Sequence, residues 1–564
     1  CIVGAAFWLL HPAPEPPRTT SLRGGALVSS IRSEPRTFNR YIGRDTVTDT
    51  ITFLTQAKLV RVNRATQELE PWLAESWTVS ADGLIYTLRL RRGLTFSDEV
   101  PFTSADVLFA FRAVYDEKTG SPLAESLRVG GKPLQVSATD DSTVIITFPS
   151  RFGPGLRLLD NLPILPRHRL ERALQQGKLA EAWGPTTPPS EIAGLGPFVL
   201  TEYQSGQRVV FARNPHYWRA DGTGLQLPYL ERLTLEIVPD QNAELLRLQT
   251  GQTDFGQSEV RSEDYASLKR AADAGRIRLL DLGVGLDPDS FWFNLNPRSK
   301  GANPRRLWLR QVELRRAISH AVDRRAFAET VFLGAAVPVF GPITPGNTRW
   351  YDPGLPKVEY DPALASRLLA GIGLVDRDGD GVREDAGGAA ARFTVVTQKG
   401  NTALERGAAF VREDLKKIGL VLDVVPLEVG ALVDRLERGE YEAIYFRFLT
   451  TDLDPALNLD FWLSSGGAHV WHPGQAAPAT VWERRIDELM EEQVATLDDA
   501  RRRELFAEVQ RIFAEQLPIV HFAAPRVYVA TSARVLNATP SLLRPAILWN
   551  PDPLAVKRPP GPGN

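Results

Sequence analysis

Residues 73–111 read LAESWTVSADGLIYTLRLRRGLTFSDEVPFTSADVLFAF. Between 86 and 91 apolar residues alternate with Thr and Arg, which is typical of a half-buried strand, and the turn residues 80–83 before it predict a hairpin. Thr103 stands three residues before Asp106 at the start of an apolar run, so a capped helix is predicted to begin there. The stretch predicts a strand, a turn and a helix in succession, which on their own fit many α/β folds.

Length and composition narrow the class of protein. A chain of 564 residues exceeds one compact core, and a prior of about 100 to 200 residues per domain predicts roughly three domains. The net charge of -2 gives no reason to expect binding to nucleic acid or to an anionic membrane. With a single cysteine the chain has no internal disulfide.

The letters of the opening stretch resemble the signature of the large extracytoplasmic solute-binding proteins that serve peptide-type ABC importers. That signature runs roughly LAxSWxxSxDGxxYTFxLRxGxxFxDGxPxTAxDVxFxF. The matching positions are Leu73, Ala74, Ser76, Trp77, Ser80, Asp82, Gly83, Tyr86, Thr87, Leu90, Arg91, Gly93, Phe96, Asp98, Pro101, Thr103, Asp106 and Val107. One departure is Glu99, which stands where the family usually has the glycine of the turn.

The resemblance implies an α/β fold of the two-lobed, type II periplasmic-binding-protein kind with an extra inserted domain. It extends over nearly all of 25–550, through segments such as 33–39, 194–198 and 213–218. The predicted organisation is a signal or anchor remnant and linker at 1–24, domain I at 25–50, inserted domain II at 51–190, domain I again at 191–285, domain III at 286–515, the return to domain I at 516–550, and a C-terminal tail at 551–564.

Two details of domain III follow from helical patterns. Residues 314–324 carry apolar side chains at helical spacing, and we expect one core helix continuing toward Gly334. Thr496, with Asp499 three residues later, is predicted to cap the last long helix.

The N-terminus indicates export. The apolar run 1–10 is too short to span a bilayer and is followed by a Pro-rich segment. Cys1 is either the lipidated first residue of a lipoprotein or part of a shortened signal peptide or anchor. Either interpretation places the protein outside the cytoplasm, in the periplasm or at the cell surface.

Chemistry-bearing motifs are few. The sequence has no P-loop, HExxH, GxSxG or CxxC, so no enzyme and no cofactor is predicted. His469 and His472 lack a third ligand and are interpreted as loop histidines, with metal binding as the alternative. Asp376, Asp378 and Asp380 begin like a calcium loop, but position 12 of that template is a glycine, which favours a tight turn over calcium.

The segment 441–455 resembles the family's strand and loop in which an Asp four places before a Pro binds the amino group of a peptide. In this chain that place holds Thr451, and Asp452 comes one residue later. Losing one partner of a buried ion pair costs about 2 to 5 kcal/mol, so ordinary peptides are in doubt if the register holds. A one-residue bulge would restore the role to Asp452.

The resemblance also implies which other residues contact the solute. These are Asn294 and Trp292 on the facing wall, Arg406 as a counter-charge, Trp462, and Thr48 and Asp49 on the rim of domain I. The expected function is capture of a peptide-like or other small polar solute by hinge closure of a monomer, followed by delivery to an ABC permease. An oligosaccharide or a metal chelate as solute, a peptide-sensing receptor without transport, and an extracytoplasmic hydrolase are the alternatives.

Overall fold

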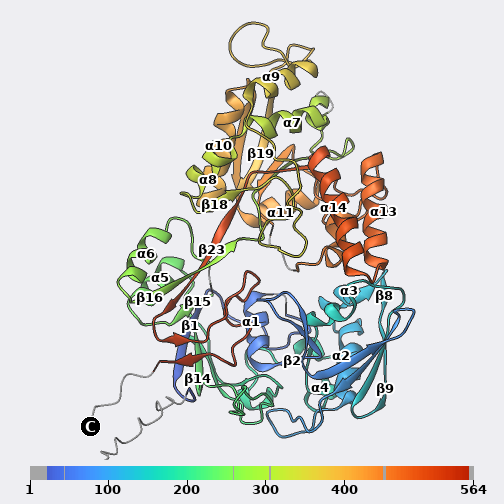
Figure 1. Ribbon diagram of the computed structural model, residues 1–564, viewed down its shortest axis with the longest axis vertical. Coiled ribbons are helices and arrows are strands. Elements are labelled where there is room, and N and C mark those ends of the chain that lie inside the picture. Colours follow the sequence, from blue (N-terminus) through green and yellow to red (C-terminus); the bar gives the residue numbers. More distant parts are fainter. Residues whose placement is uncertain (1–21, 44, 258, 304–305, 449–451, 558–564) are drawn as a thin grey trace, which may run out of the picture.

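The computed structural model describes residues 22–557 apart from 44, 258, 304–305 and 449–451. Figure 1 shows an upper lobe and a lower lobe, with the long strand β23 (Ala523–Ser532) running between them. The lower lobe holds two larger sheets and the upper lobe one. This is the two-lobed α/β architecture expected from the sequence.

The largest sheet draws strands from both ends of the chain. β1 (Ala26–Ile31) lies between β14 (Arg232–Ile237) and β15 (Phe255–Gly256) and is parallel to both. β23 follows antiparallel to β15. The remaining members and the helices beside them are β12 (Phe198–Gln204), β13 (Arg208–Arg213), β16 (Ile277–Val284), β18 (Ala336–Pro338), α5 (Gln241–Gln249) and α6 (Tyr265–Asp273). The first described strand is therefore placed only by segments that follow much later.

The rest of the lower lobe is built around a four-stranded antiparallel sheet. Its order is β5 (Ala74–Val79), β6 (Ile85–Leu90), β10 (Thr143–Thr147) and β9 (Gln135–Asp140). Other elements here are α1 (Thr46–Thr55), β2 (Ala57–Lys58), β3 (Val60–Val62), β4 (Leu69–Pro71), α2 (Ser104–Tyr115), α3 (Leu123–Ser126), β7 (Arg128–Val129), β8 (Lys132–Pro133), the 3-10 helix η1 (Gly155–Asn161), β11 (Pro163–Ile164), α4 (Arg167–Gln175), η2 (Leu179–Glu181), η3 (Pro189–Glu191), β24 (Val535–Leu536) and β25 (Ala555–Val556).

The upper lobe has a mixed five-stranded sheet with helices around it. The order is β20 (Val421–Leu427), β19 (Arg392–Gln398), β21 (Ala443–Phe446), β17 (Ser290–Phe293) and β22 (Ile519–His521). The helices are η4 (Leu307–Arg310), α7 (Val312–Ala321), α8 (Arg324–Val331), α9 (Pro362–Gly371), α10 (Thr402–Lys416), α11 (Val429–Glu437), η5 (Pro455–Leu457), α12 (Leu459–Trp462), α13 (Val481–Ala495) and α14 (Asp499–Gln516).

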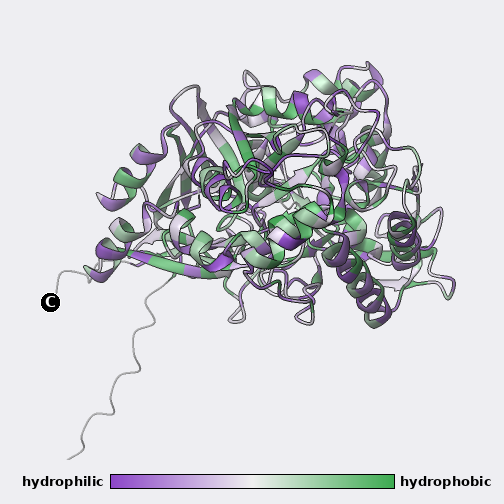
Figure 2. Ribbon diagram, turned by 90° about the horizontal axis from the view of Figure 1, so that it is seen from above, coloured by the Kyte–Doolittle hydropathy of each residue, from purple (hydrophilic) through white to green (hydrophobic). Residues whose placement is uncertain are grey.

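The hydrophobic cores follow the lobes. Leu27, Leu88 and Leu233 belong to one cluster, so the large sheet and the four-stranded sheet pack together as one lower body. Phe291 and Trp292, on opposite faces of β17, belong to two separate clusters of the upper lobe. In Figure 2 the hydrophobic segments gather in the interior strands, and hydrophilic residues line the outer helices. Two bodies with their own cores can move relative to each other.

Two chain segments pass between the lobes. One leads from β16 through Gly285 to β17, and the other leads from β22 through Phe522 into β23. They are bonded to each other, since the amide of Gly285 donates to the Pro525 carbonyl at 2.7 Å and that of Asp289 to the Ala523 carbonyl at 2.9 Å. Such a short paired crossing is the geometry of a hinge. The domain boundaries inferred from the sequence remain predictions.

Of the local predictions from the sequence, the capping box is confirmed and two helix boundaries are wrong. The capping box at Thr103 and Asp106 is confirmed, and Glu99 has φ of +68°, which explains why a glycine would suit that turn. The single helix expected through 314–324 is wrong, because Asp323 caps a second helix, α8. Thr496 ends α13, and Asp498 caps α14, so that prediction was also wrong. Asp323 and Asp498 accept free backbone amides at the starts of α8 and α14.

Among the described residues, no helix combines the length and the apolarity that crossing a membrane requires.

Candidate functional site: two cavities between the lobes

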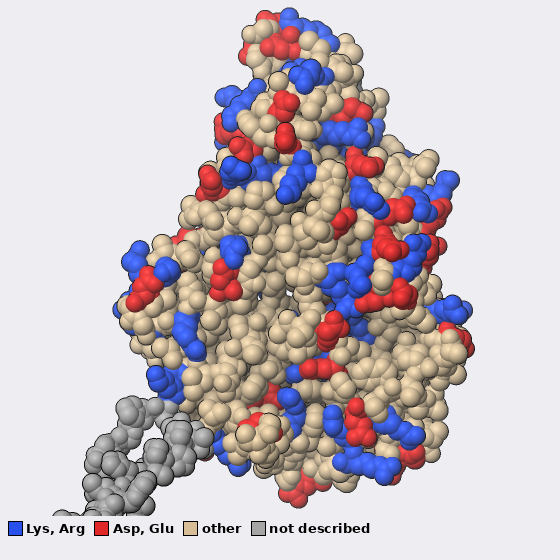
Figure 3. Space-filling view, viewed as in Figure 1, with Lys and Arg blue, Asp and Glu red and all other residues tan. Residues whose placement is uncertain are grey.

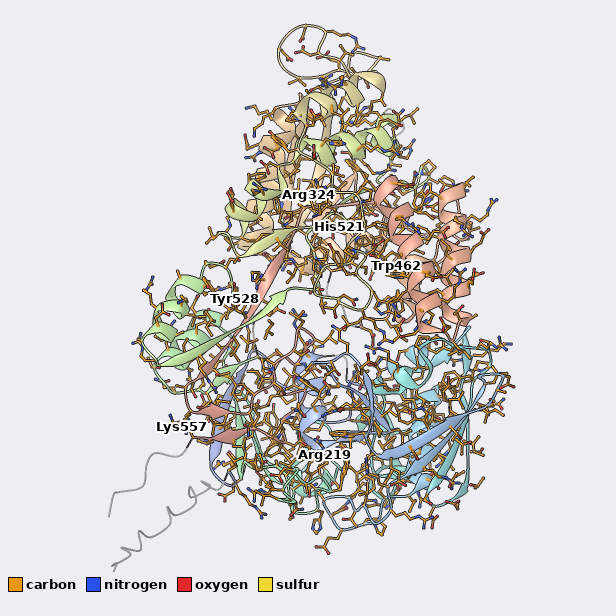
Figure 4. All side chains as sticks on the ribbon, in the orientation of Figure 1. Arg219, Arg324, Trp462, His521, Tyr528 and Lys557 are labelled. Atoms are coloured by element: carbon orange, nitrogen blue, oxygen red, sulfur yellow. The ribbon has the colours of Figure 1, made fainter. Side chains whose placement is uncertain are left out.

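A cavity of about 250 Å³ lies in the upper lobe near the hinge. Its wall is mostly apolar and comes from β22, the loop after β18, and the segment between β21 and α12. The apolar lining residues are Leu286, Pro288, Pro342, Ile343, Phe448, Leu453, Pro455, Phe461, Trp462, Ala468 and Ile519. Figure 4 labels Trp462 and His521 in the lower half of the upper lobe. This cavity suits an apolar group.

Two buried polar atoms in this cavity lack a partner. The Nε2 atom of His521 and the Oδ1 atom of Asn347 have no hydrogen-bond partner among the described residues. His521 Nδ1 lies 3.2 Å from the Ser290 hydroxyl, and burial, together with the nearby charge of Arg324, lowers the pKa of His521 to about 3. The imidazole is therefore neutral at pH 7 and can donate to or accept from a solute.

A second cavity of about 470 Å³ lies in the lower lobe, beside the start of α1 and the end of η1. Its wall is charged. The ionisable residues are Arg40, Asp45, Asp49, Lys58, Arg64, Asp160 and Arg544. A wall of this kind binds the polar parts of a ligand.

Most of these charges are matched within the protein. Arg40 pairs with Asp49 at 3.2 Å, and Lys58 pairs with Asp160 at 3.5 Å. Asp45 caps α1, accepting from the Thr48 amide at 2.8 Å. These contacts hold the charged rim of the lower cavity in place.

A salt bridge links the two lobes beside the upper cavity. Arg157, on η1 of the lower lobe, donates from Nε to Oδ1 of Asp452, which lines the upper cavity, at 3.3 Å. Only 9% and 16% of the two side chains are exposed. Burial raises the pKa of Asp452, and the nearby Arg157 opposes that rise. We call this pair the clasp, because it holds the cavity-lining faces of the two lobes together.

Further polar contacts close the boundary beside α13 and α14. Arg349 bonds to Glu68 at 3.0 Å, and the amide of Gly153 donates to the Val494 carbonyl at 2.5 Å. Figure 3 shows charged residues crowded along the right-hand side of the boundary between the lobes, while the middle of that face is mostly uncharged. The structure therefore represents a closed arrangement of the lobes.

Some predicted site residues lie away from both cavities. Asn294 donates its amide to the Ser299 hydroxyl and to the Gly439 carbonyl, which occupies it within the upper lobe. Trp292 is fully buried against Phe448. Neither Asn294 nor Trp292 is among the described residues lining the two cavities.

Of the two residues predicted on the rim of domain I, one lines a cavity and the other does not. Thr48 is buried and donates its hydroxyl to the Thr37 carbonyl and to Asp45, whereas Asp49 lines the lower cavity. Arg406 lies 3.8 Å from Glu263 of the lower lobe and lines neither cavity. Asp49 is therefore the rim residue that the structure brings to a site.

The segment 441–455, which was expected to bind the amino end of a peptide, is only partly described. Asp452 and Trp462 both line the upper cavity, and Asp452 also accepts from the Asp454 amide at 2.9 Å. Thr451 lies outside the described residues, as does Cys1. The structure thus brings Asp452, Trp462 and Asp49 to the boundary between the lobes.

The structure also describes the two sets of residues that were considered as metal ligands. Asp376, Asp378 and Asp380 form an exposed cluster with Glu384, and Asp376 accepts from the Gly379 amide at 2.8 Å. His469 and His472, expected in a solvated loop, are instead buried against Glu483 at 3.6 and 3.8 Å. Burial raises the pKa of Glu483, but the two nearby histidines and the Thr480 hydroxyl outweigh it and hold that pKa well below its usual range.

The residues that the sequence did not single out are Arg64, Arg157, Asn347 and His521. None stands in a recognisable motif. Their signal was weak: Arg64 follows a short apolar strand, and His521 interrupts an apolar run after Pro518. Polar residues in such places indicate either a buried contact or a ligand contact, and only the fold decides between them.

Comparison with known proteins identifies the relatives of this chain. The family model "Bacterial extracellular solute-binding proteins, family 5 Middle" matches residues 68–469. A probable ABC transporter-binding protein of Deinococcus radiodurans is 25% identical over 560 residues, covering 94% of this chain and 93% of the relative. Di/tripeptide-binding protein 2 of Pseudomonas aeruginosa is 26% identical over 479 residues, covering 82% and 83%.

The fold is shared with solved structures. The oligopeptide-binding protein AppA of Bacillus subtilis, solved in complex with a nonapeptide, superposes with a TM-score of 0.71 at 24% identity. The likeness covers 95% of this chain and 99% of that one. Both lobes and the crossing between them therefore belong to the shared fold.

Proposed function

Because the chain belongs to the bacterial extracellular solute-binding proteins of family 5, we propose that it captures a peptide-like solute between its lobes and delivers it to an ABC permease. The observation that carries this proposal is the pair of cavities on opposite lobes, with the clasp linking the lobes at the upper cavity and the two-segment crossing between the lobes. Hinge closure on a solute would bury it between these walls.

The chemistry of the walls fits a peptide-like solute. The apolar upper cavity accepts side chains, and the charged lower cavity accepts ends and backbone groups. Asp452, with Thr451 beside it, remains the proposed contact for the polar end of the solute. The names of relatives that bind dipeptides, tripeptides and oligopeptides support the same class.

The proposal also holds that the protein works as a monomer outside the cytoplasm, that it is attached to the membrane at Cys1, and that it catalyses no reaction. Solute-binding proteins act by non-covalent capture, so no reacting group is needed. The exposed Asp376 cluster and the pair His469 and His472 lie in neither cavity, and no role in solute capture is assigned to them.

Native mass spectrometry of protein purified without denaturation tests the proposal, since a closed binder retains its solute. The expected result is added masses that fragment as peptides and disappear after unfolding. A retained oligosaccharide or metal chelate would show that the captured solute is not a peptide. A protein that retains no solute, and that a tripeptide library fails to stabilise against heat, would contradict capture of peptides.

A further inference from the structure

One cation of the lower cavity, Arg64, has no counter-ion in the part of the chain that the structure describes. Arg64 has no carboxylate within 4.0 Å among the described residues, although Arg40, Lys58 and Arg544 in the same wall all have one. Its Nη1 atom is shielded from solvent and has no hydrogen-bond partner among those residues. A buried donor without an acceptor costs about 1 to 3 kcal/mol, more when it is charged.

The surroundings of Arg64 explain only part of its placement. Its guanidinium lies 4.6 Å from the ring centroid of Phe53, and the Lys58 ammonium lies 4.4 Å from the same ring. A cation–π contact stabilises the charge but leaves the planar N–H donors in need of an acceptor. Burial lowers the pKa of Arg64, and the charges of Asp160, Asp49 and Asp452 oppose that change.

Asp452 connects this cation with the other cavity. Its charge acts on Arg64 from the upper wall, while its Oδ1 atom is already held by Arg157. The clasp uses Oδ1 of Asp452, the one carboxylate among the described residues lining the upper cavity, and Arg64 stays available to a group that arrives with the solute. A guanidinium matches a carboxylate with two parallel hydrogen bonds.

We propose that Arg64 binds a carboxylate of the solute, and that the solute is an amphipathic acid whose apolar group enters the upper cavity. This inference rests on the proposed capture between lobes and adds the chemical class that the site selects. The carboxylate lies on the lower lobe and the apolar group on the upper lobe, so a solute carrying both groups favours the closed form.

Affinity-selection mass spectrometry tests it with paired probes. The first pair is a random tripeptide mixture as free acids and as C-terminal amides, and the second is 3-phenylpropionate and 3-phenylpropionamide. The proteins are wild type, Arg64→Gln, Arg64→Lys and the control Arg92→Gln, since Arg92 is an exposed arginine in the same lobe that lines neither cavity. Circular dichroism and melting temperature confirm that each variant folds.

We expect wild type and Arg92→Gln to prefer acids over amides by about tenfold to a hundredfold, the range for a hydrogen bond to a charged group. Arg64→Gln should lose the preference, and Arg64→Lys should keep part of it. Equal selection of acids and amides by wild type, or a preference that survives in Arg64→Gln, overturns the inference.

The two proposals fail in different ways. Binding of peptide acids and amides alike leaves peptide capture intact and rejects the role of Arg64. Binding of 3-phenylpropionate without any tripeptide supports the amphipathic acid and rejects peptides. If neither pair is selected, both proposals are rejected.

Discussion

The clasp gives the sharpest prediction about lobe closure. In Arg157→Gln the carboxylate of Asp452 loses its charged partner while the lobes are closed. Breaking a buried pair typically costs about 3 to 5 kcal/mol. The bond here is 3.3 Å long and Asp452 is 16% exposed, so we expect about 2 kcal/mol, below that range.

This cost falls on the closed form alone. In an open form Asp452 faces water and needs no partner, so the ratio of closed to open molecules should drop roughly 30-fold. Small-angle X-ray scattering without solute should therefore show a larger radius of gyration, and the affinity for a captured solute should fall by a similar factor. The mechanism predicts little change in far-ultraviolet circular dichroism.

Glu68→Gln is the matched control. It removes a charge from the same boundary between the lobes, where Glu68 bonds to Arg349, but its side chain is 69% exposed. Exposed pairs contribute about 0 to 1 kcal/mol, so scattering and affinity should stay close to wild type. If Arg157→Gln and Glu68→Gln give the same scattering and affinity, the clasp does not govern closure and the reasoning is refuted.

Three further changes test other features. Between pH 6.5 and 3 the unfolded chain protonates His521 and the folded chain does not, so the contribution of His521 to the free energy of unfolding is full above pH 6.5 and falls as the pH drops. His521→Phe should recover about 2 to 3 kcal/mol of that loss at pH 4, measured by urea unfolding at pH 7 and 4. An unchanged pH dependence of stability in this variant would contradict the prediction. Trp462→Ala and Trp350→Ala should each lose about 3 to 5 kcal/mol of stability, because both side chains are buried. Only Trp462 lines the upper cavity, so only Trp462→Ala should shift solute selection toward bulkier apolar groups. If both variants select the same solutes, Trp462 is not part of the site. Glu99→Gly should raise the free energy of unfolding by about 1 kcal/mol by relieving a positive φ, and a lower value in thermal unfolding would show that Glu99 makes a compensating contact.

The fold could be predicted because its signals are local and repeated. The hairpin and capping box of 80–106 use turn and cap chemistry that needs no distant partner. The resemblance supplied the two lobes and the inserted domain. The errors at Asp323 and Asp498 concern where one helix ends and the next begins, and helix boundaries are less certain from sequence than helix existence.

The site was harder to predict because its residues come from distant segments. Arg157 and Asp452 meet only after the lobes close, and nothing in either local sequence indicates the other. Asn294 resembles a binding residue by position, yet its amide is used by the neighbouring backbone. Sequence position identifies which segment borders the cavity, whereas the direction of each side chain depends on packing.

The arrangement of the large sheet has a consequence for biosynthesis. β1 is flanked by β14 and β15, and β23 completes the arrangement near the other end of the chain. A ribosome must reach residue 532 before this sheet can be finished, so β15 and β16 lack their shared neighbour β23 while most of the polypeptide is made. Final packing of the lower lobe therefore has to wait until nearly the whole chain has been made.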